Sequence, residues 1–254
     1  MGLLLLFRFF FFFIFGLCIG SFLNVAVWRL PLKLPIAHGA RSMCPKCGHE
    51  LHALDLVPVF SFLFLKGKCR YCGAPISARY PGVELLTGIL FGLSALKFDF
   101  SLYAVLLCVF FSMLIVASFI DIDHTWIPDR VPAVILILAV WSWFCGPSVS
   151  LTERLIGGLG VGLFMLLLSL FTGGGIGLGD VKLMASSGLL LGWKLIVPAF
   201  FLAYIFALLF WLPSIVKKKV RAHSEVCMGP FFSAALVLMS LVGNEMITWY
   251  LGLF

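Results

Sequence analysis

Long apolar runs constrain this chain more than any other feature of its sequence. An α-helix needs roughly 20 apolar residues to cross about 30 Å of hydrocarbon. Runs near or above that length occupy about residues 3–27, 102–120, 152–172, 195–213 and 229–252. Shorter apolar runs lie at about residues 83–97, 131–146 and 181–192. Because hydrophobic residues make up 62% of the chain and charged residues only 11%, too little polar surface remains to cover a water-soluble domain. We therefore predict an all-α polytopic membrane helix bundle with about eight transmembrane helices.

The first apolar run ends in Gly20-Ser21-Phe22-Leu23-Asn24 and not in a small-residue cleavage site, so we interpret it as a retained anchor. It is followed by the largest polar segment of the chain. The predicted organisation is a first transmembrane helix at residues 1–27, a loop domain at residues 28–80 and the remaining helices at residues 81–254.

The distribution of Lys and Arg predicts which side of the membrane each loop occupies. Fourteen of the 18 basic residues fall on one side of the predicted topology: eight within residues 28–80, four within residues 217–221, and Arg130 and Lys182. Cytoplasmic loops collect Lys and Arg, so we expect that side to be cytoplasmic and both chain ends to face away from it. This asymmetry and anionic membrane lipid explain the net charge of +7, and we infer no nucleic-acid partner.

Two cysteine pairs lie in the loop at residues 28–80. Cys44 and Cys47 are separated by two residues, as are Cys69 and Cys72, and 21 residues separate the pairs. Four thiolates at this spacing are typical of a structural zinc site, because each pair supplies two corners of a tetrahedron. Gly48 and Gly73 each follow a pair, where the tight turn of a zinc knuckle needs glycine. The alternatives are two disulfides, which a cytoplasmic location disfavours, or packed cysteines without a metal.

Asp180 lies between two apolar runs, at the end of Gly173-Gly174-Gly175-Ile176-Gly177-Leu178-Gly179-Asp180. An ionisable group at membrane depth costs roughly 3 kcal/mol or more, so such a residue indicates a functional site with a partner. The candidate partners Asp121, Asp123 and Asp129 follow the apolar run at 102–120, whose end we expect on the same cytoplasmic face. Asp129 precedes the next run and is typical of a helix N-cap. Asp121 is the deeper of the other two and is favoured, but these residues alone leave both open.

Two facing aspartates suggest an acid protease. One carboxylate takes a proton from water while the other donates a proton to the peptide carbonyl, with no covalent intermediate. Two carboxylates a few ångströms apart in a low dielectric cannot both be ionised, so they titrate as a pair. The glycines before Asp180 would let an extended substrate backbone approach closely, although glycines also serve helix packing.

At these residues the chain resembles the bacterial type IV prepilin peptidases, a family of membrane aspartyl proteases with a G-x-G-D motif. The resemblance extends over nearly the whole chain. It comprises Gly20-Ser21-Phe22-Leu23-Asn24-Val25 with Arg29-Leu30-Pro31, the two cysteine pairs, Ile76-Ser77 with Tyr80-Pro81 and Glu84-Leu85-Leu86-Thr87-Gly88, Asp121-x-Asp123 with Pro128-Asp129, Gly177-Leu178-Gly179-Asp180-Val181-Lys182, and Gly229-Pro230-Phe231. The family's two catalytic aspartates match Asp121 and Asp180.

The resemblance implies an enzyme in the bacterial inner membrane with its zinc loop and active site at the cytoplasmic face. Its partners would be type IV prepilins and type II secretion pseudopilins, from which it would cut the leader. It would also N-methylate the new amino terminus with S-adenosyl-L-methionine. Residues 28–80 would then be a zinc-knuckle domain associated with methyl transfer, and residues 81–254 an aspartyl peptidase domain. Glu84 is either paired at the membrane interface or part of the methyl-transfer site.

Two rival functions are consistent with parts of the sequence. One is another G-x-G-D intramembrane aspartyl protease, a group whose chains lack a four-cysteine cytoplasmic loop. The other is a non-enzymatic zinc-knuckle membrane scaffold or transporter whose aspartates bind cations. Replacing Asp121 or Asp180 by Asn separates the protease from the scaffold, because only the protease would lose cleavage.

Overall fold

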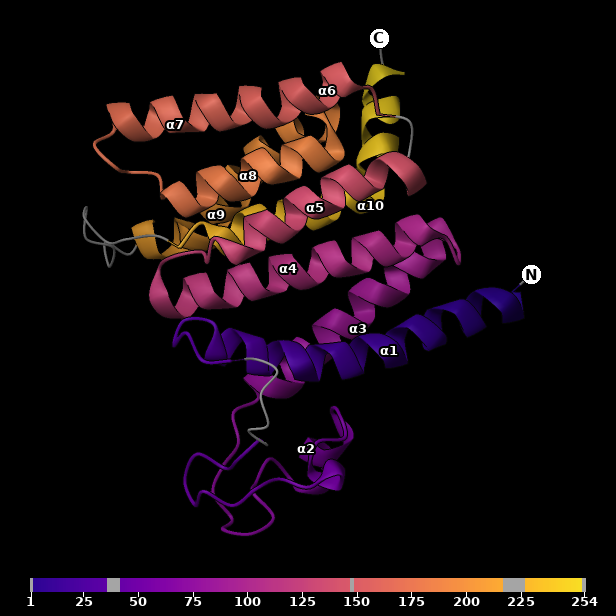
Figure 1. The fold of residues 1–254 in the computed structure, drawn as a ribbon, viewed down its shortest axis with the longest axis vertical. Coiled ribbons are helices and arrows are strands. Elements are labelled where there is room, and N and C mark those ends of the chain that lie inside the picture. The colour runs from indigo at the N-terminus through magenta and orange to yellow at the C-terminus, as the bar shows by residue number, and fades with distance from the viewer. Residues whose placement is uncertain (1, 36–41, 147–148, 217–226, 253–254) are drawn as a thin grey trace. The chain divides into compact units, whose positions relative to one another are not determined.

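The computed structural model describes residues 2–35, 42–146, 149–216 and 227–252 (Figure 1). Helices dominate these ranges, which contain two isolated β-bridges and no β-strand. The predicted all-α fold is therefore confirmed. The chain separates into two compact units, Met1–Ser112 and Met113–Phe254, with the boundary inside one helix. The finer division at residues 27 and 80 stays a prediction.

The helices follow the apolar runs closely. The first unit contains α1 (Gly2–Arg29), η1 (Ala53–Asp55), α2 (Phe60–Phe64), α3 (Arg79–Phe98) and the start of α4 (Leu102–His124). The second contains the rest of α4, α5 (Arg130–Cys145), α6 (Leu151–Leu155), the π-helical turn η2 (Ile156–Gly160), α7 (Val161–Phe171), α8 (Leu178–Leu191), α9 (Trp193–Val216) and α10 (Gly229–Leu251). All eight predicted apolar segments are thus helical.

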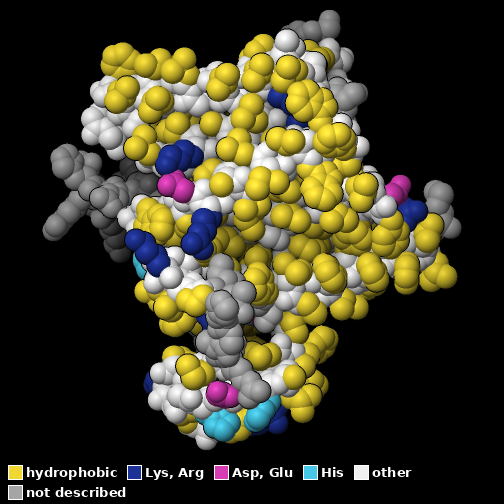
Figure 2. Space-filling model, in the orientation of Figure 1, with side chains coloured by type: hydrophobic (Ala, Val, Ile, Leu, Met, Phe, Trp, Pro, Cys, Tyr) yellow, Lys and Arg dark blue, Asp and Glu magenta, His cyan; other side chains and the backbone are white. Residues whose placement is uncertain are grey.

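Six helical segments among the described residues are long and apolar enough to cross a membrane: α1, α3, α4, α6 to α7 taken together, α9 and α10. Hydrophobic side chains cover much of the face shown in Figure 2, as expected for a surface in contact with lipid. With 16 and 14 residues, α5 and α8 are only about 21–24 Å long at 1.5 Å per residue. That α5 and α8 cross the membrane stays a prediction. The basic segment at residues 217–221 lies outside the described residues.

In the first unit, α1 packs along α3 at close range. A Cβ atom on Gly16 would lie 2.8 Å from the Gly88 backbone, and one on Gly20 would lie 2.7 Å from the Cα atom of Glu84. Small residues bring membrane helices together in this way, because dispersion contacts replace the hydrophobic effect inside lipid. Arg8, a charged residue in the first half of α1, forms an ion pair with Asp99 just after α3. That pair provides the partner that a charge within an apolar run requires.

In the second unit, α8 packs against α5, α7, α9 and α10. Figure 1 shows α8 running between α5 and the segment formed by α6 and α7. Nine of its 14 residues are buried. At the C-terminal end of α8, the side chain of Arg154 is buried. It donates hydrogen bonds to the carbonyls of Ala139, Leu189 and Leu190 and to the Ser142 hydroxyl. The carbonyls of Leu189 and Leu190 belong to the last turn of α8 and have no partners within that helix, so Arg154 caps α8. The Ala139 carbonyl lies further inside α5 and also accepts a hydrogen bond from the Ser142 hydroxyl.

Candidate active site and metal centre

Asp121 lies in the last turn of α4 and points into the second unit. Asp121 is only 5% exposed, whereas the next two residues, Ile122 and Asp123, are exposed. Successive helical positions are about 100° apart, so residues 121 and 123 face nearly opposite directions. The structure therefore resolves what these two positions alone left open, and it brings Asp121, not Asp123, to the interior.

The N-terminus of α10 holds the carboxylate of Asp121. The Gly229 amide donates a hydrogen bond of 2.9 Å to Asp121 Oδ2. A Cβ atom on residue 229 would lie only 2.8 Å from the same oxygen, so the contact requires glycine. Gly229 is the first residue of α10, where free amides and the helix dipole favour negative charge. Pro230, which has no amide hydrogen, follows at no cost in this first turn. The Gly229-Pro230 pair is thus part of the environment of Asp121.

Asp180 lies in the first turn of α8 and is 9% exposed. It is close enough to Asp121 for the charge of that residue to act on it. Asp180 Oδ1 is buried and has no hydrogen-bond partner within the described parts of the chain. A buried acceptor without a donor costs about 1–3 kcal/mol, a cost that packing alone does not explain. The structure therefore brings two predicted residues together and leaves one acceptor oxygen available.

The glycines before Asp180 have separate structural roles. Residues 172–177 are not helical, and Gly173 and Gly174 have φ values of +64° and +93°. A Cβ atom on Gly177 would lie 3.3 Å from Asp180 Oδ2, and one on Gly179 would lie 3.0 Å from the Cβ atom of Ile127. The glycine-rich segment therefore combines an open turn before the G-x-G-D motif with two close contacts within it, one beside the carboxylate and one against the segment that follows α4.

Asp129 and Lys182 form an ion pair beside this site, with Nζ and Oδ1 2.6 Å apart. Asp129 occupies the N-cap position of α5, as its place in the sequence suggested, but its side chain makes no capping hydrogen bond. It accepts from Lys182 instead. The pair joins the N-termini of α5 and α8. Because both side chains are largely exposed, we expect it to add little to stability.

Two aromatic residues near the aspartates were not expected from the sequence. Tyr204 of α9 is close enough to Asp180 to interact with its charge. The Tyr204 ring meets the ring of Phe232 edge to face, with centroids 5.9 Å apart, and Phe232 is fully buried in the first turn of α10. Both occur in apolar runs rich in Phe, so no spacing or motif distinguished them. Their positions depend on the packing of α9 against α10.

The four predicted cysteines come together in two turns of the same geometry. In the first, Cys44 N donates to His49 O and Gly48 N donates to Cys44 O; in the second, Cys69 N donates to Ala74 O and Gly73 N donates to Cys69 O. Gly48 and Gly73 both have φ = +69°, a conformation that favours glycine. The sequence-based prediction of two knuckle turns therefore agrees with the structure.

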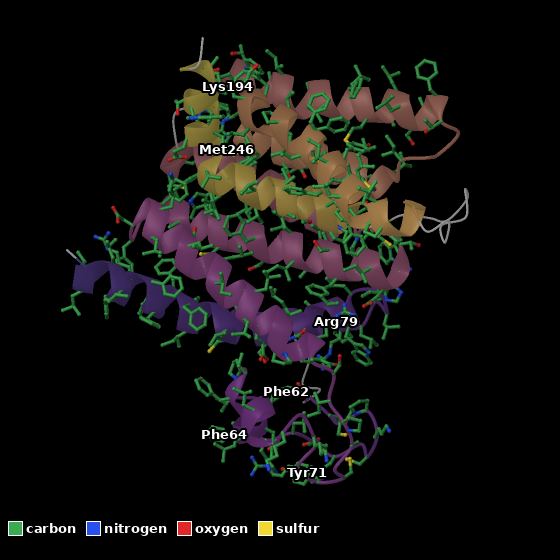
Figure 3. All side chains as sticks on the ribbon, turned by 180° about the vertical axis from the view of Figure 1, so that it is seen from behind. Phe62, Phe64, Tyr71, Arg79, Lys194 and Met246 are labelled. Carbon is green, nitrogen blue, oxygen red and sulfur yellow. The ribbon has the colours of Figure 1, made fainter. Side chains whose placement is uncertain are left out.

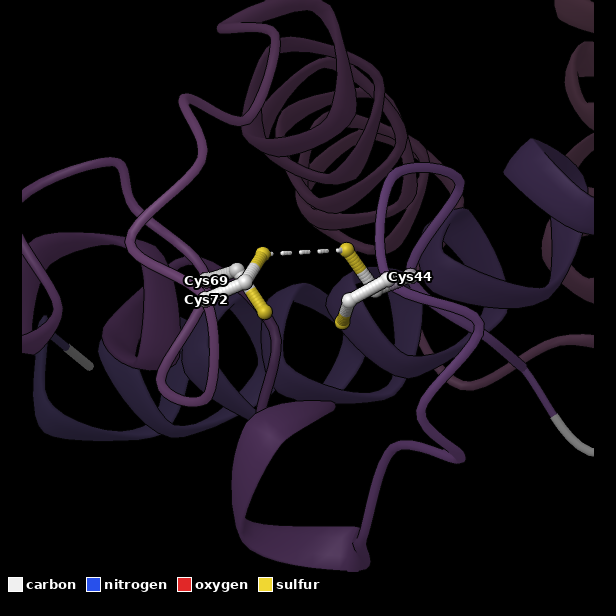
Figure 4. A group of neighbouring side chains, drawn as sticks. Cys44, Cys69 and Cys72 are labelled. Carbon is white, nitrogen blue, oxygen red and sulfur yellow. Dashed lines mark hydrogen bonds between the residues drawn. The ribbon is translucent and has the colours of Figure 1, made fainter.

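The geometry of the four sulfur atoms fits a tetrahedral metal ion. All four Sγ atoms lie within 4.8 Å of one another, and those of Cys44 and Cys72 are 3.8 Å apart (Figure 4). Zn–S bonds of about 2.3 Å at a tetrahedral angle put sulfur atoms about 3.8 Å apart. No disulfide joins these four residues, which are free cysteines. Amide hydrogen bonds from Cys47 and Lys46 lower the pKa of the Cys44 thiol to about 6, which favours the thiolate that zinc binds.

A polar network joins the two knuckle turns. The side chain of Asp55 accepts hydrogen bonds from Arg70 Nε at 2.6 Å and from the Tyr71 hydroxyl at 3.0 Å. Burial opposes ionisation of Asp55, but the Tyr71 and Arg70 hydrogen bonds outweigh it and lower the pKa of the carboxyl group. The His49 ring packs on Tyr71, with centroids 3.6 Å apart. These contacts hold the turns together with little hydrophobic core, so metal would contribute strongly to folding.

Glu84 connects the cysteine segment to the membrane helices. Its side chain is buried at the start of α3 and accepts a hydrogen bond of 2.7 Å from Val59 N, immediately before α2. Val59 has φ = +63°, which is unusual for a β-branched residue. Of the two interpretations of Glu84, the structure therefore supplies the contact expected for a residue paired at the interface.

Comparison with known proteins agrees with both units. Residues 14–98 match the bacterial peptidase A24 N-terminal domain, and residues 108–212 match the type IV leader peptidase family. The first match contains the second half of α1, the four cysteines and α3, and the second contains both buried aspartates. No solved structure has significant similarity to the chain.

Several relatives align with almost the full length of the chain, and all three described here are named prepilin leader peptidase/N-methyltransferase. One from Bacillus subtilis (strain 168) is 36% identical over 94% of this chain and 96% of its own length. Another from Aeromonas hydrophila is 34% identical over 95% and 93%, and one from Dichelobacter nodosus is 34% identical over 91% of each. With this identity over nearly complete chains, and with both domains matched in order, the chain belongs to the type IV leader peptidase family.

Proposed function

We propose that this chain is a membrane aspartic endopeptidase that removes the leader from type IV prepilins and type II secretion pseudopilins. In this proposal Asp121 and Asp180 are the catalytic pair. The observation that carries it is their proximity, with both carboxylates buried and one oxygen of Asp180 without a donor. Membership of the family supports the same reaction.

The surroundings of the two aspartates suggest which one is the base. Asp121 Oδ2 accepts the amide of Gly229 at a helix N-terminus, an arrangement that stabilises the anion. Asp180 Oδ1 has no such donor among the residues described. We therefore assign the general base to Asp121 and the general acid to Asp180.

With these roles the reaction is balanced. Asp121 takes a proton from water as the water oxygen attacks the scissile carbonyl carbon, and Asp180 donates its proton to the carbonyl oxygen. Asp121 then returns its proton to the leaving nitrogen while Asp180 recovers one from the tetrahedral diol, and the C–N bond breaks. Both carboxyl groups end in their starting states, and no covalent intermediate forms.

We place the active site and the cysteine segment at the cytoplasmic face of the bacterial inner membrane. Support comes from the distribution of charge, because 14 of the 18 Lys and Arg residues fall on the side of the predicted topology that contains both. A basic leader would stay on that side, and the apolar helix that follows it in the substrate would lie in the bilayer.

The second proposed activity is N-methylation of the amino group that cleavage exposes. It rests on the names of the relatives and on the presence of the four-cysteine segment. Zinc bound by Cys44, Cys47, Cys69 and Cys72 would have a structural role, because four thiolates complete its tetrahedron and leave no open position. S-adenosyl-L-methionine is the methyl donor that the family implies, and we assign it no residues.

The test is prepilin processing by Asp121→Asn and Asp180→Asn variants, with Asp123→Asn as the matched control. Asp123 lies in the same turn of α4 but is exposed. In cells that co-express a prepilin, we expect no cleavage by either of the first two variants and normal cleavage by the control. If membrane-inserted Asp121→Asn and Asp180→Asn proteins both process the prepilin normally, the protease assignment is wrong.

A further inference from the structure

The cysteine segment exposes large apolar side chains on its short helix α2. Phe60, Leu63 and Phe64 are 54%, 62% and 82% exposed, and Val57, one turn earlier, is also exposed. We call these four residues the α2 patch. Phe60 and Phe64 are one helical turn apart, so they share one side of α2, and Val57 lies in the turn just before it. Figure 3 shows Phe64 on the outer side of α2, apart from Tyr71 on the knuckle turns.

The α2 patch is not needed for the packing of the segment itself. Phe62 is the aromatic residue of α2 that turns inward, where its ring lies 3.1 Å from the position that a Cβ atom on Gly67 would occupy. The Gly67 amide also donates to the Phe62 carbonyl. The knuckle turns are held by the Asp55 network described above. Aromatic side chains that a domain neither buries nor uses for folding mark a contact surface.

The start of α2 is attached directly to helices that cross the membrane. Val59, between the first two members of the α2 patch, donates to Glu84 Oε2 at 2.7 Å. Glu84 belongs to α3 and packs against Gly20 of α1, and both helices are long and apolar enough to cross a membrane. The cysteine segment also follows the end of α1 directly and leads into the start of α3. The hydrogen bond from Val59, the residue before Phe60, therefore holds the α2 patch beside the membrane.

The charges next to the α2 patch match a lipid surface. Lys66 and Lys68 follow α2 directly and are exposed. Aromatic and aliphatic side chains next to lysines are the combination found in elements that lie in the membrane interface, where lysine attracts anionic headgroups. A second copy of the chain fits less well, because a stable interface needs about 20–30 residues on each side and the patch has four.

We propose that the α2 patch inserts into the boundary between headgroups and acyl chains, and that Lys66 and Lys68 contact anionic phospholipid headgroups. The cysteine segment is then docked on the bilayer at a second point, in addition to its two connections to α1 and α3.

The test uses the zinc-loaded full chain in vesicles of phosphatidylcholine and phosphatidylglycerol. A photoreactive benzoylphenylalanine replaces Phe64 in one variant, Phe60 in a second and Met43 in a control, because the Met43 side chain is 58% exposed and lies outside the α2 patch. The mass of the illuminated protein reports what each position contacts. The zinc content of each variant shows whether the segment is folded.

We expect lipid adducts at positions 60 and 64 in at least fivefold excess over position 43. We also expect Lys66→Gln with Lys68→Gln to reduce the share of phosphatidylglycerol in those adducts. Equal labelling at all three positions, no lipid adduct, or a cross-linked protein dimer would each overturn the proposal. Because the readout is a lipid adduct and not cleavage, its failure would leave the protease assignment untouched.

Discussion

Replacement of Gly229 by Ala provides a direct test of how Asp121 is held. A Cβ atom at residue 229 would lie 2.8 Å from Asp121 Oδ2, 3.0 Å from its Cβ atom and 3.1 Å from its Cγ atom. Ordinary contact begins at 3.4 Å, so the carboxylate or the start of α10 must move by about 0.6 Å, from 2.8 to 3.4 Å. A misplacement of about 1 Å at a catalytic group can cost about 100-fold in rate. We therefore expect kcat/KM to fall by about 10- to 100-fold, or about 1.4–2.7 kcal/mol of transition-state stabilisation.

The assay is cleavage of a purified prepilin by Gly229→Ala enzyme in lipid and detergent micelles, with thermal unfolding measured in parallel. Gly160→Ala is the matched control, because Gly160 is also helical and a Cβ atom there meets nothing closer than 4.0 Å. We expect the control to cleave normally. Full activity of Gly229→Ala, or an equal loss in both variants, would refute the idea that a close contact at residue 229 positions Asp121.

Three further predictions follow from named contacts. Cys44→Ser should lower the zinc content of the purified protein from about one ion per chain to near zero, whereas the control Cys18→Ser, in α1, should retain its zinc. Zinc retained by both variants would contradict the four-thiolate site. Arg154→Leu should leave the Leu189 and Leu190 carbonyls at the end of α8 without the side chain that caps them and destabilise the protein by about 1–3 kcal/mol, seen as a lower Tm; an unchanged Tm would mean that the cap is dispensable. Lys182→Gln removes an exposed ion pair worth about 0–1 kcal/mol and should keep cleavage within about threefold of the parent, whereas a loss as large as that of Asp180→Asn would give Lys182 a role in the reaction.

Much of the candidate site could be predicted because its chemistry is local in the sequence. The cysteine pairs carry their own turns, with Gly48 and Gly73 in the required conformation, so spacing alone indicated the metal centre. Asp180 was identifiable because a carboxylate between apolar runs is costly. The expected pairing with the end of α4 followed from topology. By contrast, the depth of Asp121 only favoured it over Asp123, because which of the two faces inward depends on how α4 is rotated against its neighbours.

Other features depend on contacts between distant parts of the chain. The Gly229 amide reaches Asp121 across 108 residues, and Tyr204 lies near Asp180 only because α9 packs beside α8. The hydrogen bond from Val59 to Glu84 likewise joins a polar loop to a membrane helix. None of these pairs has a characteristic spacing, and the residue that meets the carboxyl group in each pair, a Gly, a Tyr or a Val, is of a type common in apolar segments.

The sequence by itself determined that this is a helical membrane protein with a four-cysteine segment and an aspartate at membrane depth, because composition and short-range spacing govern those properties. Only the tertiary structure decided which aspartate faces inward, which amide holds it and which tyrosine lies near Asp180. The physical reason is that lipid is as apolar as the protein interior. An apolar helix in a membrane therefore has no polar face to show its orientation, and its rotation is set by close packing and by a few buried polar contacts.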